Sequence, residues 1–432
     1  MNILLLGSGG REHAMAAKIA ESPLCERLYM APGNAGMAAC GELVSLDIDN
    51  FDAIRLFVTS RGVQMVVVGP EAPLVAGIAD YFATTPSLQG VMLIGPTKAA
   101  AQLEGSKQFA KDFMMRHGVP TARYKAFDSH AAKEAAAFLK TLKPPYVLKA
   151  DGLAAGKGVV IASTLDEAQR ELKEMLVHKK FGEASGTVVI EEYLQGIELS
   201  VFVLTDGKHY KMMPAAKDYK RIGDGDTGLN TGGMGSVSPV PFADKAFMKK
   251  VEENIVVPTI KGIRQEKLDY RGFLFIGLMN VDGEPYVIEY NCRMGDPETE
   301  VVFPRIQSDM VEQMQLAWER HLTHAALSVD PRVAASVMMV SDGYPEKYKK
   351  GYPISGLDKV TDSMVYHAGT ARNAKGEFVT NGGRVLCLTT LAPSLPEALL
   401  KSYQSAARVS WSGSHYRKDI GQDLLKYLIE RQ

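Results

Sequence analysis

The sequence predicts an α/β protein built from three domains. Its 432 residues are about three times the length of an ordinary domain. At the start of the chain, short apolar runs alternate with amphipathic stretches, which is the rhythm of a parallel sheet with crossover helices. Farther along, apolar runs follow one another more closely, as in antiparallel sheets. We therefore expect the domains 1–104, 105–326 and 327–432.

The composition is that of a globular protein, with 46% apolar and 23% charged residues. The 49 basic residues balance the 50 acidic ones, so no global field favours nucleic acid or a membrane surface. The apolar run at the N-terminus is too short for a signal peptide, and no stretch approaches the roughly 18 apolar residues of a membrane span. Four scattered cysteines show neither metal spacing nor a disulfide pattern. We expect a cytoplasmic enzyme that acts on small molecules.

The N-terminal domain is expected to contain strands at 3–7, 27–31, 65–69 and 91–95 and helices at 11–21, 51–60 and 97–104. The loop GSGGREH after the first strand offers backbone N–H groups at a helix N-terminus, where anions bind. Gly7 and Gly9 begin a dinucleotide fingerprint, but Glu12 replaces its third glycine and no acid follows the second strand. One phosphate, assisted by Arg11, fits better than a dinucleotide. The alternative is a tight turn that needs glycine for its geometry alone.

The stretch KADGLAAGKGVV resembles a P-loop but differs from one in its spacing. Gly152 and Gly156 are one residue too close, and Gly158 stands where Ser or Thr is required. The β-branched residues that follow favour a strand rather than a helix. The pattern therefore predicts a glycine hairpin in which Lys149 and Lys157 hold a triphosphate under a lid. The alternative is an ordinary flexible hairpin.

Two acidic strands follow. In VVIEEYLQGIE, Glu191 and the backbone near Leu194 suit an adenine edge and Glu198 suits a ribose, although a solvated strand end has the same pattern. In YVIEYNCRMGDPETE, Glu289 and Asn291 share one face of a strand because side chains alternate. Their oxygen atoms suit magnesium.

Arg293 shares that face and Asp296 follows it, so a structural ion-pair cluster is the competing interpretation of the same stretch. Cys292 faces the other way and is expected to be a small core residue. The polar, glycine-rich loop 217–235 begins with several charges, including Asp218, and could hold a small zwitterion.

Further helices are expected at 164–176, 244–264, 395–407 and 419–430, strands at 333–341 and 384–391, and a hairpin turning at Asp282 and Gly283. The strand lysine, glycine hairpin, acidic strand and Glu-x-Asn strand together resemble the ATP-grasp superfamily. Within it, the chain resembles the phosphoribosylamine–glycine ligase (glycinamide ribonucleotide synthetase) family from end to end. Eight stretches carry this resemblance: GSGGREHA, APGNAG, VGPEAPLVAGIAD, LEGSKQFAKDF, KADGLAAGKGV, DYKRIGDGDTGLNTGGMG, EYNCRMGDPETE and TNGGRVLCLT.

The resemblance implies a Rossmann-like pre-ATP-grasp domain, an ATP-grasp domain with a glycine-rich lid at about 122–193, and a small C-terminal α+β domain. It also implies an activity, in which ATP, glycine and 5-phosphoribosylamine give glycinamide ribonucleotide, ADP and phosphate. A magnesium or manganese ion and a monomeric enzyme are expected with it.

Carried over position by position, the resemblance places ATP phosphates and adenosine at Lys107, Lys149, Gly152, Gly156, Lys157, Gly158, Glu191, Leu194 and Glu198. It places the metal at Glu289 and Asn291, and glycine at Asp218, Arg293 and Asp296. Phosphoribosylamine is expected at Gly9, Gly10, Arg11, Glu12 and Glu71. Catalysis is expected from Arg293, Asp296 and Lys149.

One position departs from the wider superfamily. Many ATP-grasp enzymes carry another metal-binding Glu about twelve residues before Glu289, where this chain has Gly277. The ligands of a second metal are therefore in doubt. Two other functions stay open: a nicotinamide-dependent oxidoreductase, which an NAD-induced thermal shift would reveal, and a non-catalytic ATP sensor, which would release no ADP in response to glycine.

Overall fold

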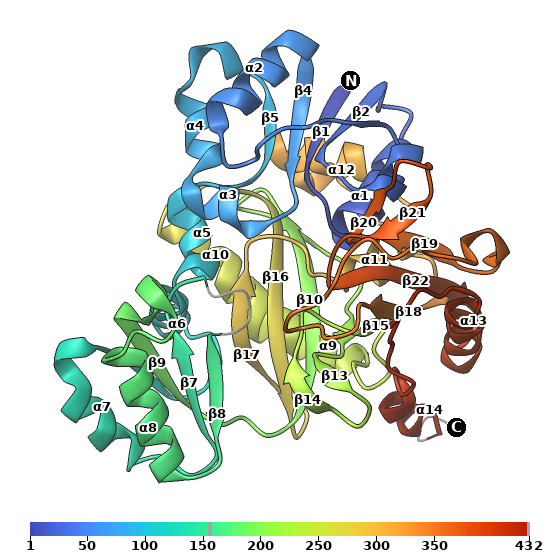
Figure 1. Ribbon diagram of the computed structural model, residues 1–432. Coiled ribbons are helices and arrows are strands. Elements are labelled where there is room, and N and C mark those ends of the chain that lie inside the picture. The colour runs from blue at the N-terminus through green and yellow to red at the C-terminus, as the bar shows by residue number, and fades with distance from the viewer. Residues whose placement is uncertain (154–157, 430–432) are drawn as a thin grey trace.

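The structure is a computed structural model, which describes residues 1–153 and 158–429 (Figure 1). The N-terminal region lies at the top of the view, a small four-stranded sheet at the lower left and the C-terminal region on the right. A nine-stranded sheet runs through the middle. It connects the N-terminal region to the central region of the chain.

The N-terminal region is the expected parallel sheet with crossover helices. Neighbouring strands β1, β2, β4 and β5 are all parallel, and alternate residues of β1 face two different apolar cores, Leu4 on one side and Leu5 on the other. Both faces are thus covered, as in α/β proteins. The elements are β1 (Asn2–Gly7), α1 (Gly10–Ala20), β2 (Arg27–Pro32), β3 (Glu42–Leu43), α2 (Phe51–Arg61), β4 (Val63–Val68), α3 (Glu71–Ala76), α4 (Ile78–Thr84), β5 (Met92–Pro96) and α5 (Lys98–Gly105).

The parallel sheet continues into the central region without a break. Strand β16 (Tyr270–Val281) pairs antiparallel with β5, through Tyr270 opposite Pro96 and Arg271 opposite Gly95. Gly272 makes this approach possible, because a Cβ atom there would lie within 3.2 Å of the Gly95 backbone. Beyond β16 lie β10 (Ile197–Thr205), β11 (Tyr210–Met212) and β17 (Glu284–Asn291). Helix α6 (Lys107–Arg116), which the sequence analysis did not predict, leads from α5 into this region.

A separate antiparallel sheet, called the lid sheet here, contains β6 (Tyr124–Asp128), β9 (Thr187–Glu192), β7 (Tyr146–Ala150) and β8 (Val159–Ala162). Helices α7 (Ala132–Leu139) and α8 (Leu165–Leu176) pack on it around a small core of their own. Strands β7 and β8 form the expected hairpin. The expected sites Gly156 and Lys157 lie outside the described residues. The stretch VVIEEYLQGIE divides between two sheets, because β9 joins the lid sheet and β10 the large one.

The C-terminal region contains a five-stranded sheet in the order β12 (Lys217–Asp218), β15 (Gly235–Ser238), β18 (Val333–Val340), β22 (Arg384–Ala392), β19 (Met364–His367). Helix α13 (Leu395–Arg408) covers it as predicted. The helix expected at 419–430 is wrong. Gly421 takes a left-handed φ of 77°, which an α-helix cannot include, so only a 3-10 turn η9 (Gln422–Leu424) and a short α14 (Lys426–Ile429) form.

Two further differences concern the central region. The helix expected at 244–264 is continuous but contains a π-helical turn, η5 (Glu252–Val256), between α9 (Lys245–Val251) and α10 (Val257–Gln265). This turn lies just before Pro258, which has no N–H group for the regular helical bond. The expected loop 217–235 contains a hairpin of β13 (Arg221–Gly223) and β14 (Thr227–Asn230). No helix in the described part of the chain is long and apolar enough to cross a membrane.

Candidate functional site

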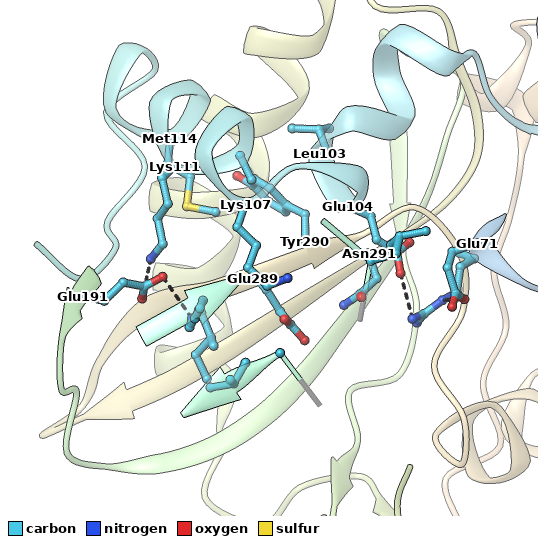
Figure 2. Close-up of a pocket in the computed structure, with 17 residues that line it drawn as sticks. Glu71, Leu103, Glu104, Lys107, Lys111, Met114, Glu191, Glu289, Tyr290 and Asn291 are labelled. Atoms are coloured by element: carbon cyan, nitrogen blue, oxygen red, sulfur yellow. Dashed lines mark hydrogen bonds and ion pairs between the residues drawn. The ribbon is translucent and has the colours of Figure 1, made fainter. Parts of the chain in front are cut away.

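A cavity of ≈ 170 Å³ opens between the lid sheet, helix α6 and strand β17. Figure 2 shows Lys107, Glu289 and Asn291 among the side chains that line it. The residues predicted from the sequence that it brings together are Lys107, Lys149, Gly158, Glu191, Glu289, Asn291, Arg293 and Glu71. Parts of the chain that are far apart in sequence, from Glu71 to Arg293, therefore converge on one space.

One wall of this cavity is a buried triad of two lysines and a glutamate. Glu191 forms ion pairs with Lys111 at 2.9 Å and with Lys149 at 3.0 Å, and all three side chains are at most 7% exposed. Burial raises the pKa of Glu191, but the two ammonium groups outweigh it and the net shift is downward. Burial lowers the pKa of Lys111 to about 8. The triad carries one net positive charge facing the cavity, which suits an anion.

The opposite wall carries the expected metal ligands. Glu289 and Asn291 both face the cavity from β17, and the amide nitrogen of Asn291 is buried with no hydrogen-bond partner among the described residues. A carboxylate and an amide oxygen are suitable ligands for a hard divalent cation. The described residues contain no group of three or more His, Cys, Asp or Glu side chains that could hold a metal alone, so phosphate oxygens would complete the coordination. Gly277 lies directly opposite Glu289 on β16, where another acid would stand.

Lys107 begins helix α6 and lies beside these ligands. Its Nζ donates to the carbonyl of Gly152 at 3.3 Å, which links the helix to the glycine hairpin. Burial lowers the pKa of Lys107, and Glu289 opposes that shift. Gly152 itself lines a neighbouring hollow together with Gly186 and Thr187.

Arg293 is held by two carboxylates from different elements. Its Nε contacts Glu71 of α3 at 3.1 Å and its Nη2 contacts Glu104 of α5 at 2.8 Å. Glu104 also accepts from the backbone N–H of Cys292 at 2.8 Å. Glu104 was not among the predicted residues, because a lone acid at a helix end has no distinctive spacing. Cys292 is buried in an apolar core, as expected.

A second cavity, of ≈ 480 Å³, lies over the N-terminus of α1 and includes Gly9, Arg11, Glu12 and Asp296. The expectation of free donors here needs correction. Glu12 accepts from the Gly9 N–H at 2.7 Å and from Arg11 Nε at 2.6 Å, while Arg11 Nη1 donates to the carbonyl of Met294 at 3.2 Å. The charge of Arg11 is therefore largely balanced by Glu12, which fills the position of the missing third glycine. Gly10 packs against Glu300 and does not line this cavity.

Asp296 lies where the second cavity meets a third one at the C-terminal region. Arg384 of β22 contacts its Oδ1 at 3.1 Å. Glu300 is fully buried, and burial together with the negative charge of Asp296 raises the pKa of Glu300 well above its ordinary value. Arg384 belongs to the stretch TNGGRVLCLT, but no role was predicted for it.

The remaining predicted residues lie apart from the first cavity. Lys220 bonds to Glu198 and lies 3.5 Å from Asp218, so these three charges form one cluster at the start of the loop 217–235. Leu194 is half-buried in the connection between β9 and β10. Neither Glu198 nor Leu194 lines the first cavity.

The chain matches three models of known protein families. The models of the phosphoribosylglycinamide synthetase N domain, ATP-grasp (A) domain and C domain match residues 1–104, 105–299 and 334–423. The chain belongs to the phosphoribosylglycinamide synthetase family. It is therefore an ATP-dependent ligase, and ATP with a divalent metal ion is the general requirement of ATP-grasp enzymes.

Relatives in this family match along their whole length. The phosphoribosylamine–glycine ligases of Vibrio vulnificus (strain CMCP6) and Haemophilus influenzae (strain ATCC 51907 / DSM 11121 / KW20 / Rd) are 45% and 46% identical over 426 residues, with 98% of each chain covered. The crystal structure of the Thermotoga maritima phosphoribosylamine–glycine ligase has a TM-score of 0.84 at 35% identity, covering 97% of this chain and 100% of that one. A biotin carboxylase from Campylobacter jejuni (TM-score 0.70, 16% identity, covering 96% and 92%) shares the fold.

Proposed function

We propose that the protein joins glycine to 5-phosphoribosylamine at the expense of ATP, giving glycinamide ribonucleotide, ADP and phosphate. The observation that carries this proposal is the short segment from Glu289 to Asp296, which lines the first cavity at one end and the second at the other. A phosphoryl group transferred in the first cavity and an amine held in the second can therefore meet at one intermediate.

ATP is assigned to the first cavity and to residues outside it. Lys107, Lys149, Gly152, Gly156, Lys157 and Gly158 would face its phosphates. Glu191 would face its adenosine, together with Leu194 and Glu198, which do not line the cavity. Glu289 and Asn291 would hold magnesium or manganese, which when bound neutralises charge on the phosphates. Lys149 is fixed by Glu191 at the end of a strand, so its ammonium group is already oriented for an anion.

Glycine is assigned to Asp218, Arg293 and Asp296. The carboxylate of glycine takes the γ-phosphoryl group of ATP, forming glycyl phosphate and ADP. Arg293 would orient that carboxylate, and Asp218 and Asp296 would attract the ammonium group. Because Arg293 already contacts Glu71 and Glu104, we infer that glycine shares the guanidinium with them rather than meeting a bare cation.

Phosphoribosylamine is assigned to Gly9, Gly10, Arg11, Glu12 and Glu71. The second cavity lies at the N-terminus of α1 and contains the Arg11–Glu12 pair, which suits a molecule with one phosphate and several hydroxyl groups. The amine of phosphoribosylamine attacks the carbonyl carbon of glycyl phosphate. The C–N bond forms, phosphate leaves and the nitrogen loses a proton. Covering the site keeps out water that would hydrolyse the acyl phosphate.

We further propose a monomeric cytoplasmic enzyme with domains 1–104, 105–326 and 327–432, the lid spanning about 122–193. All four cysteines are free thiols, in keeping with a reducing compartment. Light scattering at several protein concentrations tests the monomer.

The activity is tested by ADP release with phosphoribosylamine generated in situ. We expect ADP to depend on glycine, with alanine a much poorer substrate, and mass spectrometry to identify glycinamide ribonucleotide. ATP binding without glycine-dependent ADP release would instead indicate a nucleotide sensor. A product containing no glycine would contradict the proposal.

A further inference from the structure

The loop 217–235 carries the charged cluster of Asp218 and Lys220, and a segment far along the chain grips this loop. That segment, residues 415–424, is called the C-terminal clamp here. Its apolar residues Ile420 and Leu424 are fully buried in the core of the C-terminal region. Its polar residues point the other way, toward the loop.

Arg417 is the centre of the clamp. Its side chain is only 1% exposed. The guanidinium contacts Asp226 at 2.8 Å and donates to the carbonyl of Arg221 at 3.1 Å, so it joins strand β13 to the turn that precedes β14. Two more bonds, at 2.8 and 2.7 Å, join it to Asp419 within the clamp. Such a forked arrangement fixes direction as well as distance.

The backbone continues this attachment. Asp419 accepts from the Gly225 N–H at 2.8 Å, and the Lys418 N–H donates to Asp224 at 2.8 Å. Tyr403 of α13 holds the clamp in turn, since its hydroxyl bonds to the Arg417 carbonyl and the Ile420 N–H at 3.0 and 2.9 Å. The turn of the β13–β14 hairpin is therefore attached to the C-terminal region through Asp224 and Gly225.

Asp423 brings the attachment to the functional cluster itself. It accepts from the hydroxyl of Tyr219 at 2.6 Å and lies 3.4 Å from the Lys217 ammonium group, which in turn lies 3.8 Å from the centre of the Tyr219 ring. Lys217 and Tyr219 flank Asp218 in sequence. Their side chains point to the clamp, while Asp218 and Lys220 lie on the side of Glu198. Alternate residues thus divide between anchoring and the site.

We propose that the C-terminal clamp is a positioning element of the active site, which holds the loop 217–235 so that Asp218 and Lys220 face the substrates. Arg417, Asp419 and Asp423 touch no substrate in this scheme, and they act through the loop. The expected effect of the clamp on glycine kinetics rests on the proposed function, whereas its effect on the position of the loop does not.

Two isosteric substitutions test the clamp. Asp423→Asn removes the charge that fixes Tyr219 and Lys217. Asp226→Asn removes the exposed partner of Arg417, at a left-handed φ of 55° that asparagine tolerates. Asp362→Asn is the matched control, since Asp362 pairs with Arg408 in the same region and contacts no part of the loop. We expect KM for glycine to rise about fivefold or more in the first two variants, with KM for ATP within about twofold of wild type.

Trypsin reports on the loop without any reaction. Lys217, Lys220 and Arg221 are cleavage sites that the clamp should protect, so we expect cleavage there to be about tenfold faster in the two clamp variants than in the control, at equal melting temperature. Unchanged cleavage or unchanged glycine saturation in both variants overturns the proposal. Faster cleavage together with wild-type protein that releases no glycine-dependent ADP would uphold the clamp's hold on the loop and reject the proposed activity.

Discussion

Glu289 has no acidic residue opposite it on the neighbouring strand β16, where Gly277 lies. Glu289→Gln keeps the shape of the side chain and removes its charge. We expect kcat to fall at least about a hundredfold, the usual effect of losing one preorganised electrostatic contact. The measurement is glycine-dependent ADP release, with circular dichroism to check the fold. Near-normal turnover in a folded variant would show that Glu289 is no metal ligand.

Arg11 offers a test of which cavity takes which substrate. Arg11→Ala should weaken phosphoribosylamine binding by about 1.5–3 kcal/mol, the value of a hydrogen bond to a charged group. ATP affinity, measured by calorimetry without the other substrates, should stay the same, because Arg11 lies in the second cavity. Arg55→Ala is the control, since Arg55 forms an exposed ion pair in the same domain. Loss of ATP binding with normal phosphoribosylamine saturation would reverse the two assignments.

At the residue scale, the sequence could predict contacts that a single element decides. Glu289 and Asn291 alternate on one strand, and they do line one cavity. Lys111 follows Lys107 by four residues, so the two lysines lie on the same face of the helix. This spacing indicates that Lys111 lines the same cavity as Lys107. Glu104 and Arg384 differ from these. Their partners, Arg293 and Asp296, come from other elements, and only the tertiary packing brings them together.

At the scale of elements, Glu104 connects helix α5 to the end of strand β17. Glu104→Ala leaves the Arg293 guanidinium without its more buried partner, and breaking a buried ion pair costs about 3–5 kcal/mol. We expect a loss of that size in the free energy of unfolding, measured with urea. Glu71→Ala, which removes the other partner of the same guanidinium, is the matched variant. The Glu71 side chain is 31% exposed, so about 1 kcal/mol or less should be lost. Equal losses would mean that Glu104 does not anchor the helix.

Elements with a clear period were predicted well. The four buried strands of the N-terminal region and the helices expected at 11–21, 51–60 and 97–104 are present within a residue or two, because apolar periodicity decides where they begin and end. Helices α3 and α4, between β4 and β5, were not predicted. Short strands such as β12 and β13 were not predicted. They contain two or three residues and form only because distant partners bond to them, and the same competition replaces a helix at 419–430, where Asp419 and Asp423 bond to the loop.

At the scale of the whole molecule, two histidines join the first and last regions. His13 of α1 accepts from the backbone N–H of His367 at 2.7 Å, and their rings lie 5.7 Å apart. Burial lowers the pKa of His13 to about 4 and that of His367 to about 3, with Arg372 adding to the second shift. Both are neutral in the folded protein, so the unfolded chain binds protons more readily than the folded one.

Stability should therefore be complete above pH ~6.5 and should fall as the pH drops toward 4, by up to about 1.4 kcal/mol per pH unit for each histidine. His13→Asn keeps an acceptor for the His367 N–H but cannot titrate. We expect its unfolding free energy, measured with urea at pH 7 and pH 5, to decline less than that of the wild type. An equal decline would place the acid sensitivity elsewhere.

The three domains expected from length and from the change in apolar spacing stay a prediction. The continuity of the large sheet could not be predicted from the sequence. It rests on two residue pairs between β5 and β16, and nothing near residue 96 indicates that a strand at residue 270 will pair with it.

The pairing of β5 with β16 also has a consequence for folding during translation. When the first hundred residues leave the ribosome, the edge of β5 at Gly95 and Pro96 still has no partner. At about 5–20 residues per second, β16 is translated roughly ten to thirty seconds later. An uncovered edge strand can recruit strands of other chains during that interval. We expect nascent or truncated N-terminal fragments to aggregate more readily than the full chain, and Pro96, which donates no N–H, to shorten the exposed edge.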